Sequence, residues 1–297
     1  MVRYEILAAA AAVTILAGCR NDIDFDACGQ IDAEQVTVSA EASGRILSIN
    51  VREGDVLNAG QMVGAVDSVQ TALQIRELEQ RRDGARSRLI DIDRQQAPQK
   101  DQLASLENDF RRYSSLLANN AATQKQVDDL RSQIDILKSQ MAAQKQTWER
   151  NNSSVRSEIS TYDIQIAEKK EQLAKCRICA PVAGTVLTKY ANEGESVTVG
   201  KPLFKLANLA ETYVRAYFTT SQLATLKLGV ELKVIPDDGS ANPKEYTGRV
   251  IWISSQAEFT PKDIQTRDER AELVYAVKVA VPNDGSLRLG MYAYVRK

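Results

Sequence analysis

The four cysteines at positions 19, 28, 176 and 179 have the most distinctive chemistry in this chain. Cys176 and Cys179 form a CxxC motif, the spacing of thiol–disulfide oxidoreductases. This motif enters a predicted strand rather than opening a helix, so we expect no redox activity from it. The chain has no histidine, which excludes a Ser-His-Asp triad, a Cys-His dyad and most catalytic zinc sites. The sequence therefore predicts a protein that is not an enzyme and holds no cofactor or metal.

Cys19 follows a segment with the features of an export signal. Arg3 precedes an apolar run over residues 6–17, which at 12 residues is shorter than the roughly 20 that a membrane span needs. The run ends in Leu-Ala-Gly-Cys, which resembles the bacterial lipobox, where the signal is removed and the cysteine becomes lipid-modified. We therefore expect a signal peptide over residues 1–18 and a lipidated linker over residues 19–35.

Residues 44–66 recur without a gap as residues 184–206. Each copy alternates apolar and polar residues between turns marked by glycine, which is typical of short strands that bury one face. Neither copy alone can close a core, so we predict that residues 36–67 and 176–209 are two halves of one β-sandwich. The predicted turn glycines coincide in pairs: Gly44 with Gly184, Gly54 with Gly194, and Gly60 with Gly200.

The export signal and the repeat together suggest a disulfide. In an oxidising compartment, the three thiols other than Cys19 would give one disulfide and one free thiol. Cys28 lies just before the first half of the sandwich and Cys176 just before the second. Their equivalent placement motivates the hypothesis that Cys28 and Cys176 pair.

A heptad pattern fills residues 68–175, between the two halves. Apolar residues recur in alternating steps of three and four from Ile75 to Leu117 and again from Val127 onward, with one extra four-residue step from Val155 to Ile159. Residues 118–123 separate the two runs and contain turn and N-cap residues. We therefore predict an antiparallel coiled-coil hairpin with arms of roughly 75 Å and its tip near residues 118–123.

Polar residues test the register of this hairpin. Folding the chain about the tip sets Gln96 and Gln99 opposite Gln144, as a polar layer within the apolar seam. The seam of the second arm also includes Asn151. Pro98 cannot donate a helical hydrogen bond, so a kink or short break is expected there.

The C-terminal third, residues 210–297, has several strand-like runs bounded by turns such as Pro236–Gly239 and Pro282–Gly285. Thr220 or Ser221 can cap a short helix over residues 222–227, which Gly229 would end. This pattern predicts a small β-barrel. The chain carries a net charge of −1, so it lacks the basic excess that drives nucleic-acid binding. The predicted strands are 213–218, 230–235, 246–253, 273–281 and 292–295.

The order of signal, half-sandwich, hairpin, second half-sandwich and barrel resembles the membrane fusion proteins of the HlyD type, also called periplasmic adaptors. The halves look like lipoyl domains, and Ala180–Gly184 and Glu258–Thr266 are similar to family segments. The resemblance implies an elongated α+β protein: a split lipoyl-like β-sandwich, interrupted by a coiled-coil α-hairpin and followed by a β-barrel. True lipoyl carriers present a modified lysine at the junction of the halves, and no lysine lies near Ser68.

The resemblance also implies partners and contact residues. The family's tip pattern matches Arg112, Leu116 and Thr123 here, with threonine in place of the family's serine, and these residues would contact an outer-membrane channel of the TolC type. The barrel would face an inner-membrane transporter, and the chains would form a ring, by family expectation a hexamer. A lipid at Cys19 would hold the protein in the periplasm, at the inner membrane.

Two alternatives remain open at this stage. The absence of a further domain between the barrel and Lys297 and the Glu258–Thr266 segment favour an ABC-type exporter over a proton-driven pump of the RND or MFS type. The other alternative is a non-transport lipoprotein, in which the coiled coil serves as an envelope scaffold. The exported substrate is not encoded in any feature of the sequence.

Overall fold

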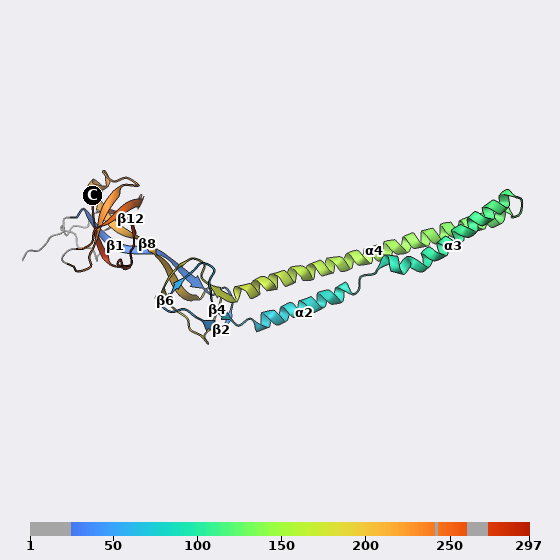
Figure 1. Ribbon diagram of the computed structural model, residues 1–297, viewed down its shortest axis with the longest axis horizontal. Helices are drawn as coiled ribbons and strands as arrows, with labels where there is room; N and C mark the ends of the chain where they lie inside the picture. Colours follow the sequence, from blue (N-terminus) through green and yellow to red (C-terminus); the bar gives the residue numbers. More distant parts are fainter. Residues whose placement is uncertain (1–24, 241–242, 260–272) are drawn as a thin grey trace, which may run out of the picture.

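The computed structural model describes residues 25–240, 243–259 and 273–297. The molecule is elongated: a β-barrel lies at one end, a β-sandwich follows it, and a long helical hairpin projects from the sandwich (Figure 1). The predicted fold class is confirmed. The expected signal peptide, Cys19 and residues 260–266 of the family-like segment lie outside the described residues.

The two repeat halves form one folded body. The first half contributes β1 (Ala27–Ser39), β2 (Gly44–Ile49), β3 (Val56–Leu57) and β4 (Met62–Val66), and the second contributes β5 (Arg177–Cys179), β6 (Gly184–Lys189), β7 (Ser196–Val197) and β8 (Pro202–Thr219). Strands pair across the halves, β1 with β8, β2 with β7, β3 with β6 and β4 with β5. Side chains from both halves fill a single core, including Ile46, Val66, Val186, Leu203 and Phe204. Neither half could bury these side chains alone.

Four of the six paired glycines occupy turns in the left-handed region. Gly54 and its counterpart Gly194 have φ of 93° and 86°, which an L-residue adopts only with strain. Gly60 and Gly200 behave in the same way, at 77° and 89°. Gly44 and Gly184 instead begin strands β2 and β6. A side chain at Gly184 would place its Cβ 2.7 Å from the carbonyl oxygen of Ala207, so close packing requires glycine there.

Six strands close the barrel. The added strands are β9 (Glu231–Pro236), β10 (Tyr246–Ile253), β12 (Leu273–Pro282) and β13 (Tyr292–Arg296), with the short β11 (Glu258–Phe259) at one edge. The order β12-β10-β9-β13-β1-β8 returns to β12 through the β8–β12 pairing. The helix α5 (Thr220–Leu223) starts two residues before the predicted one and begins with a capping box at Thr219.

The strands β1 and β8 each run through both β-domains (Figure 1). Residues 27–33 of β1 pair with β8 or β13 inside the barrel, so most of the expected linker over residues 19–35 that the structure describes is a barrel strand. The expected boundary between residues 209 and 210 likewise falls inside β8. The β1–β8 register shifts between Ala33 and Gln35, and such an irregularity bends a strand pair. The two domains are therefore joined by a continuous, bent two-stranded ribbon.

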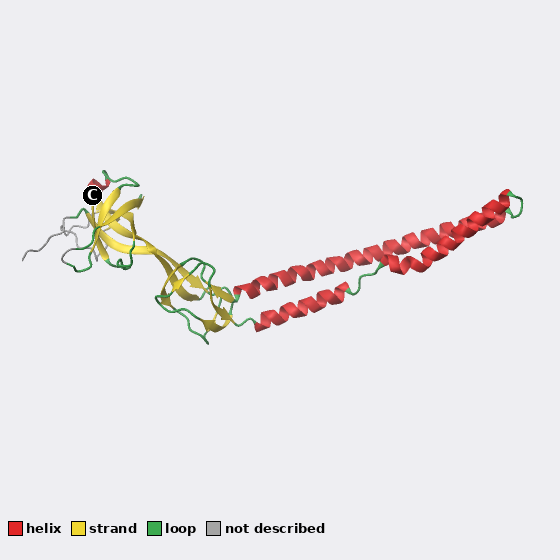
Figure 2. Cartoon of the chain, in the orientation of Figure 1, coloured by secondary structure: helices red, strands yellow, loops and turns green. Residues whose placement is uncertain are grey.

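The hairpin consists of three helices (Figure 2). The first arm contains α2 (Val69–Arg86) and α3 (Ile92–Ala118), and the second arm is the single helix α4 (Gln124–Lys175). The first arm is interrupted at residues 87–91, whereas α3 continues through Pro98. The break expected at Pro98 is therefore displaced toward the base of the hairpin.

The predicted polar layer is present. The Gln99 amide donates from Nε2 to Oε1 of Gln144 at 3.0 Å, and Gln96 donates to the carbonyl oxygen of Met141 at 2.9 Å. These contacts confirm the antiparallel register about the tip. The second arm departs from the predicted seam at one place: Asn152 is buried, and Asn151 is exposed.

Candidate functional site

The tip of the hairpin is a tightly bonded turn. The helix α3 ends at Ala118 and α4 begins at Gln124, as the turn residues predicted. Asn120 has φ of 56°, the one positive value outside glycine among the described residues. Both Asn119 and Ala121 donate their backbone N–H to the carbonyl oxygen of Leu116, at 3.1 and 2.8 Å. Because a free helix end leaves carbonyl groups unpaired, this pattern gives the tip a defined shape.

Thr123 is the N-cap of α4. Its Oγ1 accepts a hydrogen bond from the backbone N–H of Gln126 at 3.4 Å, and its own N–H donates to Oε1 of Gln126 at 2.9 Å. This reciprocal arrangement is a capping box. The side chain that the family pattern assigns to channel contact therefore also starts the second arm.

Arg112 and Leu116 lie four residues apart, on one face of the last two turns of α3. The Arg112 guanidinium pairs with Asp109 at 2.8 Å and lies 5.5 Å from the ring centre of Tyr113, yet 66% of its side chain is exposed. Leu116 is 38% exposed. The tip thus presents a cation, an apolar side chain and a hydroxyl group to solvent. These groups suit contact with another protein rather than a reaction.

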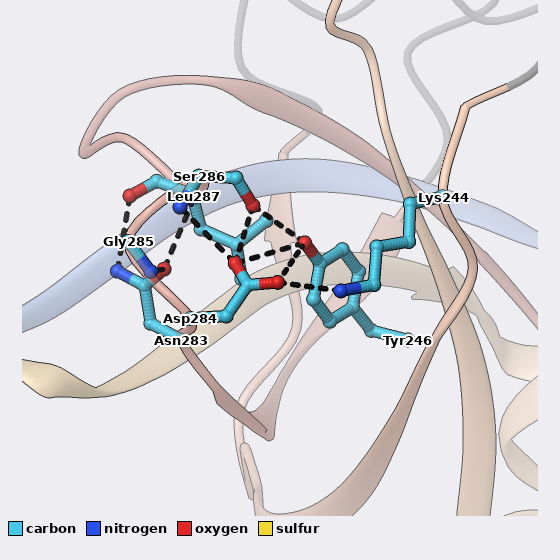
Figure 3. Close-up of polar contacts among 7 residues, drawn as sticks. All are labelled: Lys244, Tyr246, Asn283, Asp284, Gly285, Ser286 and Leu287. Atoms are coloured by element: carbon cyan, nitrogen blue, oxygen red, sulfur yellow. Dashed lines mark hydrogen bonds and ion pairs between the residues drawn. The ribbon is translucent and has the colours of Figure 1, made fainter.

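A second polar centre, predicted only as a turn, is formed by residues 283–287 together with Lys244 and Tyr246 (Figure 3). Asn283 donates from Nδ2 to the carbonyl oxygens of Leu209 and Leu287, at 2.9 and 3.0 Å. Its Oδ1 accepts from the backbone N–H groups of Gly285 and Leu287. Since Leu209 lies on β8 where that strand passes between the domains, Asn283 ties a barrel loop to the connecting ribbon.

Asp284 organises the rest of this loop. Its carboxylate accepts hydrogen bonds from Lys244 at 2.5 Å, from Ser286 and from the hydroxyl of Tyr246 (Figure 3). These donors, Lys244 first, hold the pKa of the Asp284 carboxyl well below its usual range. The loop borders a cavity of about 490 Å³ that reaches from Leu187 in the sandwich to Leu289 in the barrel. The signal for this centre was the pair Asn283-Asp284, whose side chains bond to nearby backbone.

The predicted disulfide between Cys28 and Cys176 is wrong. Within the part of the chain that the structure describes, Cys28, Cys176 and Cys179 are all free thiols. Cys28 lies on β1 in the barrel, opposite Tyr217 and Tyr294, whereas Cys176 is buried in the core of the sandwich. Equivalent places in a repeat do not bring two residues together when the strand between them leads into another domain.

Among residues 25–240, 243–259 and 273–297, no group of three or more acidic, cysteine or histidine side chains could hold a metal ion. Within the same part of the chain, no helix is both long and apolar enough to cross a membrane.

Comparison with known proteins agrees with this geometry. Residues 34–208 match the model of the barrel-sandwich hybrid domain of RND membrane fusion proteins. A UPF0194 membrane protein of Yersinia enterocolitica is 27% identical, with the alignment covering all of this chain and 99% of the relative. The UPF0194 membrane protein YbhG of Salmonella arizonae is 28% identical, over 98% of this chain and 95% of the relative.

Solved structures share the fold. MacA from Actinobacillus actinomycetemcomitans superposes with a TM-score of 0.59 at 18% identity, over 91% of this chain and 76% of MacA. The membrane fusion protein Spr0693 from Streptococcus pneumoniae R6 has a TM-score of 0.54 at 17% identity, over 91% of this chain and 96% of Spr0693. The matched family model makes the chain a membrane fusion adaptor, which is not a class of enzymes. The chain belongs to the family of RND-type membrane fusion proteins with a barrel-sandwich hybrid domain.

Proposed function

We propose that this chain is a periplasmic adaptor that joins an inner-membrane exporter of the ABC type to an outer-membrane channel of the TolC type. The observation that carries the proposal is the position of the tip. The 52 residues of α4 hold it about 78 Å from the sandwich, and the barrel lies at the opposite end of the molecule (Figure 1). One chain therefore offers two separate contact surfaces for two separate partners.

The barrel end is the proposed contact for the transporter and for the membrane. A lipid on Cys19 would anchor the chain a few residues before β1, and several acyl chains would make that attachment firm. Copies of the chain would pack side by side into a hexameric ring, with the hairpins standing together as a tube. The contribution to transport is geometric: a conduit whose rigid helices couple the state of the transporter to the channel.

The transporter class has a second candidate. The matching family model is that of RND membrane fusion proteins, which supports an adaptor for a proton-driven pump. The ABC assignment is supported by the likeness of Glu258–Thr266 to adaptors of ABC exporters. Affinity purification of the chain from native membranes, after reversible cross-linking, distinguishes the two. Co-purification of an ATPase-coupled permease supports the ABC type, and recovery of a proton-driven pump overturns it.

Photo-cross-linking at the tip tests the channel contact. In cells, a photoreactive amino acid replaces Leu116 near the end of α3. The matched control replaces Ile136, an apolar residue on α4 away from the tip that is more exposed, at 58%. We expect Leu116 to capture an outer-membrane channel protein and Ile136 to capture none. Equal capture from both positions, or capture of peptidoglycan-bound proteins alone, would favour an envelope scaffold.

A further inference from the structure

The first arm breaks between α2 and α3 although its hydrophobic seam is continuous. Residues 87–91 contain neither glycine nor proline, and the proline of this arm lies inside α3. Sharp interruptions in helices come from proline, from glycine, from a π-bulge or from a side chain that enters the hydrogen-bond ladder. The heptad seam runs through Ala85, Leu89 and Ile92 without a missed step. Gly84 weakens the last turn of α2 and Asp91 caps α3, whereas the seam favours one continuous helix.

A contact from the other arm holds the break open. Asn152 of α4 accepts a hydrogen bond from the backbone N–H of Ile90 at 2.8 Å and donates one to the carbonyl oxygen of Ile90 at 2.7 Å. Asn152 is 4% exposed, so neither of its polar groups is well placed to bond to water instead. One side chain thus satisfies both backbone groups of a residue that has left the helix.

The bonds at Ile90 replace those of a helix. In a continuous helix the Ile90 carbonyl would accept from the N–H of Arg94. That N–H is instead bound by the side chain of Asp91 at 3.2 Å, because Asp91 caps the new helix α3. Rejoining the helix therefore exchanges these partners, Asn152 and Asp91, for the helix backbone.

The hydrophobic seam of α4 matches the length of the first arm in its broken form. Extended residues advance about 3.3 Å each against 1.5 Å in a helix, so the three non-helical residues 89–91, of which Asp91 is extended, lengthen the first arm by up to about 5 Å, close to one turn. The seam of α4 contains one extra four-residue step, from Val155 to Ile159, which is also about one turn. The ion pair of Arg88 with Glu158, at 2.5 Å, lies beside this step.

We propose that Asn152 is the positioning residue of the hairpin: its amide holds the first arm in the broken form and so sets the register of α2 against the base of α4. When the amide releases Ile90, the continuous seam draws α2 and α3 into one helix, and α2 shifts by about one turn relative to α4. One-turn shifts between packed helices are a known switching element. In the proposed adaptor, this shift would change how the tip stands relative to the β-domains.

Limited trypsin digestion of the purified full chain tests the proposal at the bond after Arg88, which is exposed and lies in the break. In Asn152→Leu the seam gains an apolar residue and Ile90 loses both partners, so we expect cleavage there to become several-fold slower as the helix closes. The matched control is Asn151→Leu, at the exposed neighbouring asparagine, and should cleave like the wild type. Unchanged or faster cleavage in Asn152→Leu would show that Asn152 merely braces a loop, and would overturn the proposal.

A second variant separates this switch from general damage. Asp91 has φ of −76°, which the proline ring accepts, whereas proline inside a closed helix is strongly unfavourable. Adding Asp91→Pro to Asn152→Leu should therefore restore the break and wild-type cleavage. The register is read from a cross-link between Glu79→Cys and Lys170→Cys, made with a short thiol-specific bis-maleimide that spans the space of the two native side chains, whose ends pair at 3.5 Å. Cys19, Cys28, Cys176 and Cys179 are replaced by alanine. This cross-link should form in the wild-type hairpin, be lost with Asn152→Leu and return with Asp91→Pro, and failure to return contradicts the proposal.

These measurements do not depend on any partner. The proposed function could fail, with no channel captured at Leu116, while the one-turn shift is still observed. Conversely, channel capture could succeed in a chain whose break does not respond to Asn152. The two ideas are therefore tested separately.

Discussion

Gln99 donates a hydrogen bond to Gln144 at 3.0 Å across the hairpin, and this contact marks which turn of α3 faces which turn of α4. The side-chain oxygen of Gln99 is less satisfied, because this Oε1 is buried without a partner among the described residues. An unpaired buried acceptor costs about 1–3 kcal/mol. The pair therefore specifies the register at some expense in stability.

This relationship predicts the effect of an apolar replacement. The double variant Gln99→Leu/Gln144→Leu should raise the melting temperature by a few degrees, since about 1 kcal/mol corresponds to roughly 2–4 °C in a domain of 150–250 residues. Circular dichroism at 222 nm follows the melting of the hairpin directly. A lower melting temperature would show that the hydrogen bond outweighs the unpaired oxygen.

Charge reversal at the tip should affect export without affecting the fold. Arg112→Asp places a carboxylate beside Asp109, its present ion-pair partner, and removes the cation offered to a channel. We expect loss of channel association, with helicity and melting temperature within error of the wild type. The control is Arg111→Asp, because Arg111 is the adjacent exposed arginine and bonds to Asn108 instead. Equal loss in both variants would point to overall charge rather than to the contact face.

Thr123 should matter for the start of α4 even without a channel. Thr123→Ala removes an N-cap, worth about 1 kcal/mol, whereas Thr123→Ser retains the hydroxyl. Hydrogen exchange at the amide of Gln126, the partner of the cap, should be about fivefold faster in the alanine variant, the factor that 1 kcal/mol gives. The serine variant should stay near the wild type. Similar exchange in all three proteins would mean that the cap does not stabilise this turn.

The joint between the β-domains should respond to acid. Hydrogen bonds from Lys244 and Ser286 lower the pKa of Asp284 in the folded state, so the folded protein binds fewer protons than the unfolded one in acid. The stabilisation that the Asp284 carboxylate gives is therefore complete above the ordinary aspartate pKa of about 4 and is lost as the pH falls further. The melting temperature of Asp284→Asn should lie below that of the wild type at pH 7, and the difference should shrink below about pH 4. A difference that stays constant with pH would contradict a role for the carboxylate charge.

The thiols should be reduced and slow to react. Burial raises the pKa of the Cys28 thiol, and burial together with Asp67 raises that of Cys176, so less of the reactive thiolate is present at neutral pH. Peptide mapping without reductant should find Cys28, Cys176 and Cys179 unpaired. Alkylation of Cys28 and Cys176 at pH 8 should be slower than that of a free cysteine peptide, and should reach the peptide's rate after denaturation. A Cys28–Cys176 peptide in the map would contradict the structure.

Much of the architecture could be predicted from local pattern. The duplicated half-sandwich, the tip at residues 118–123 and the strand at residues 246–253 follow from glycine placement and hydrophobic period, which short stretches of chain encode by themselves. The pairing of Gln99 with Gln144 could be predicted as well, because an antiparallel hairpin has one register once its tip is known. The tip residues Arg112, Leu116 and Thr123 were found by resemblance, and their channel contact remains a prediction.

Other features were decided by contacts between distant parts of the chain. The seam through Leu89 and Ile92 indicates an unbroken helix, yet the arm is broken there and Asn152, 62 residues from Ile90, bonds to the Ile90 backbone. The strand β1 enters the barrel because β13, at the far end of the sequence, pairs with it, and this separates Cys28 from Cys176. Periodicity records which face of an element is buried, but the partner that buries it is chosen only when the whole chain folds.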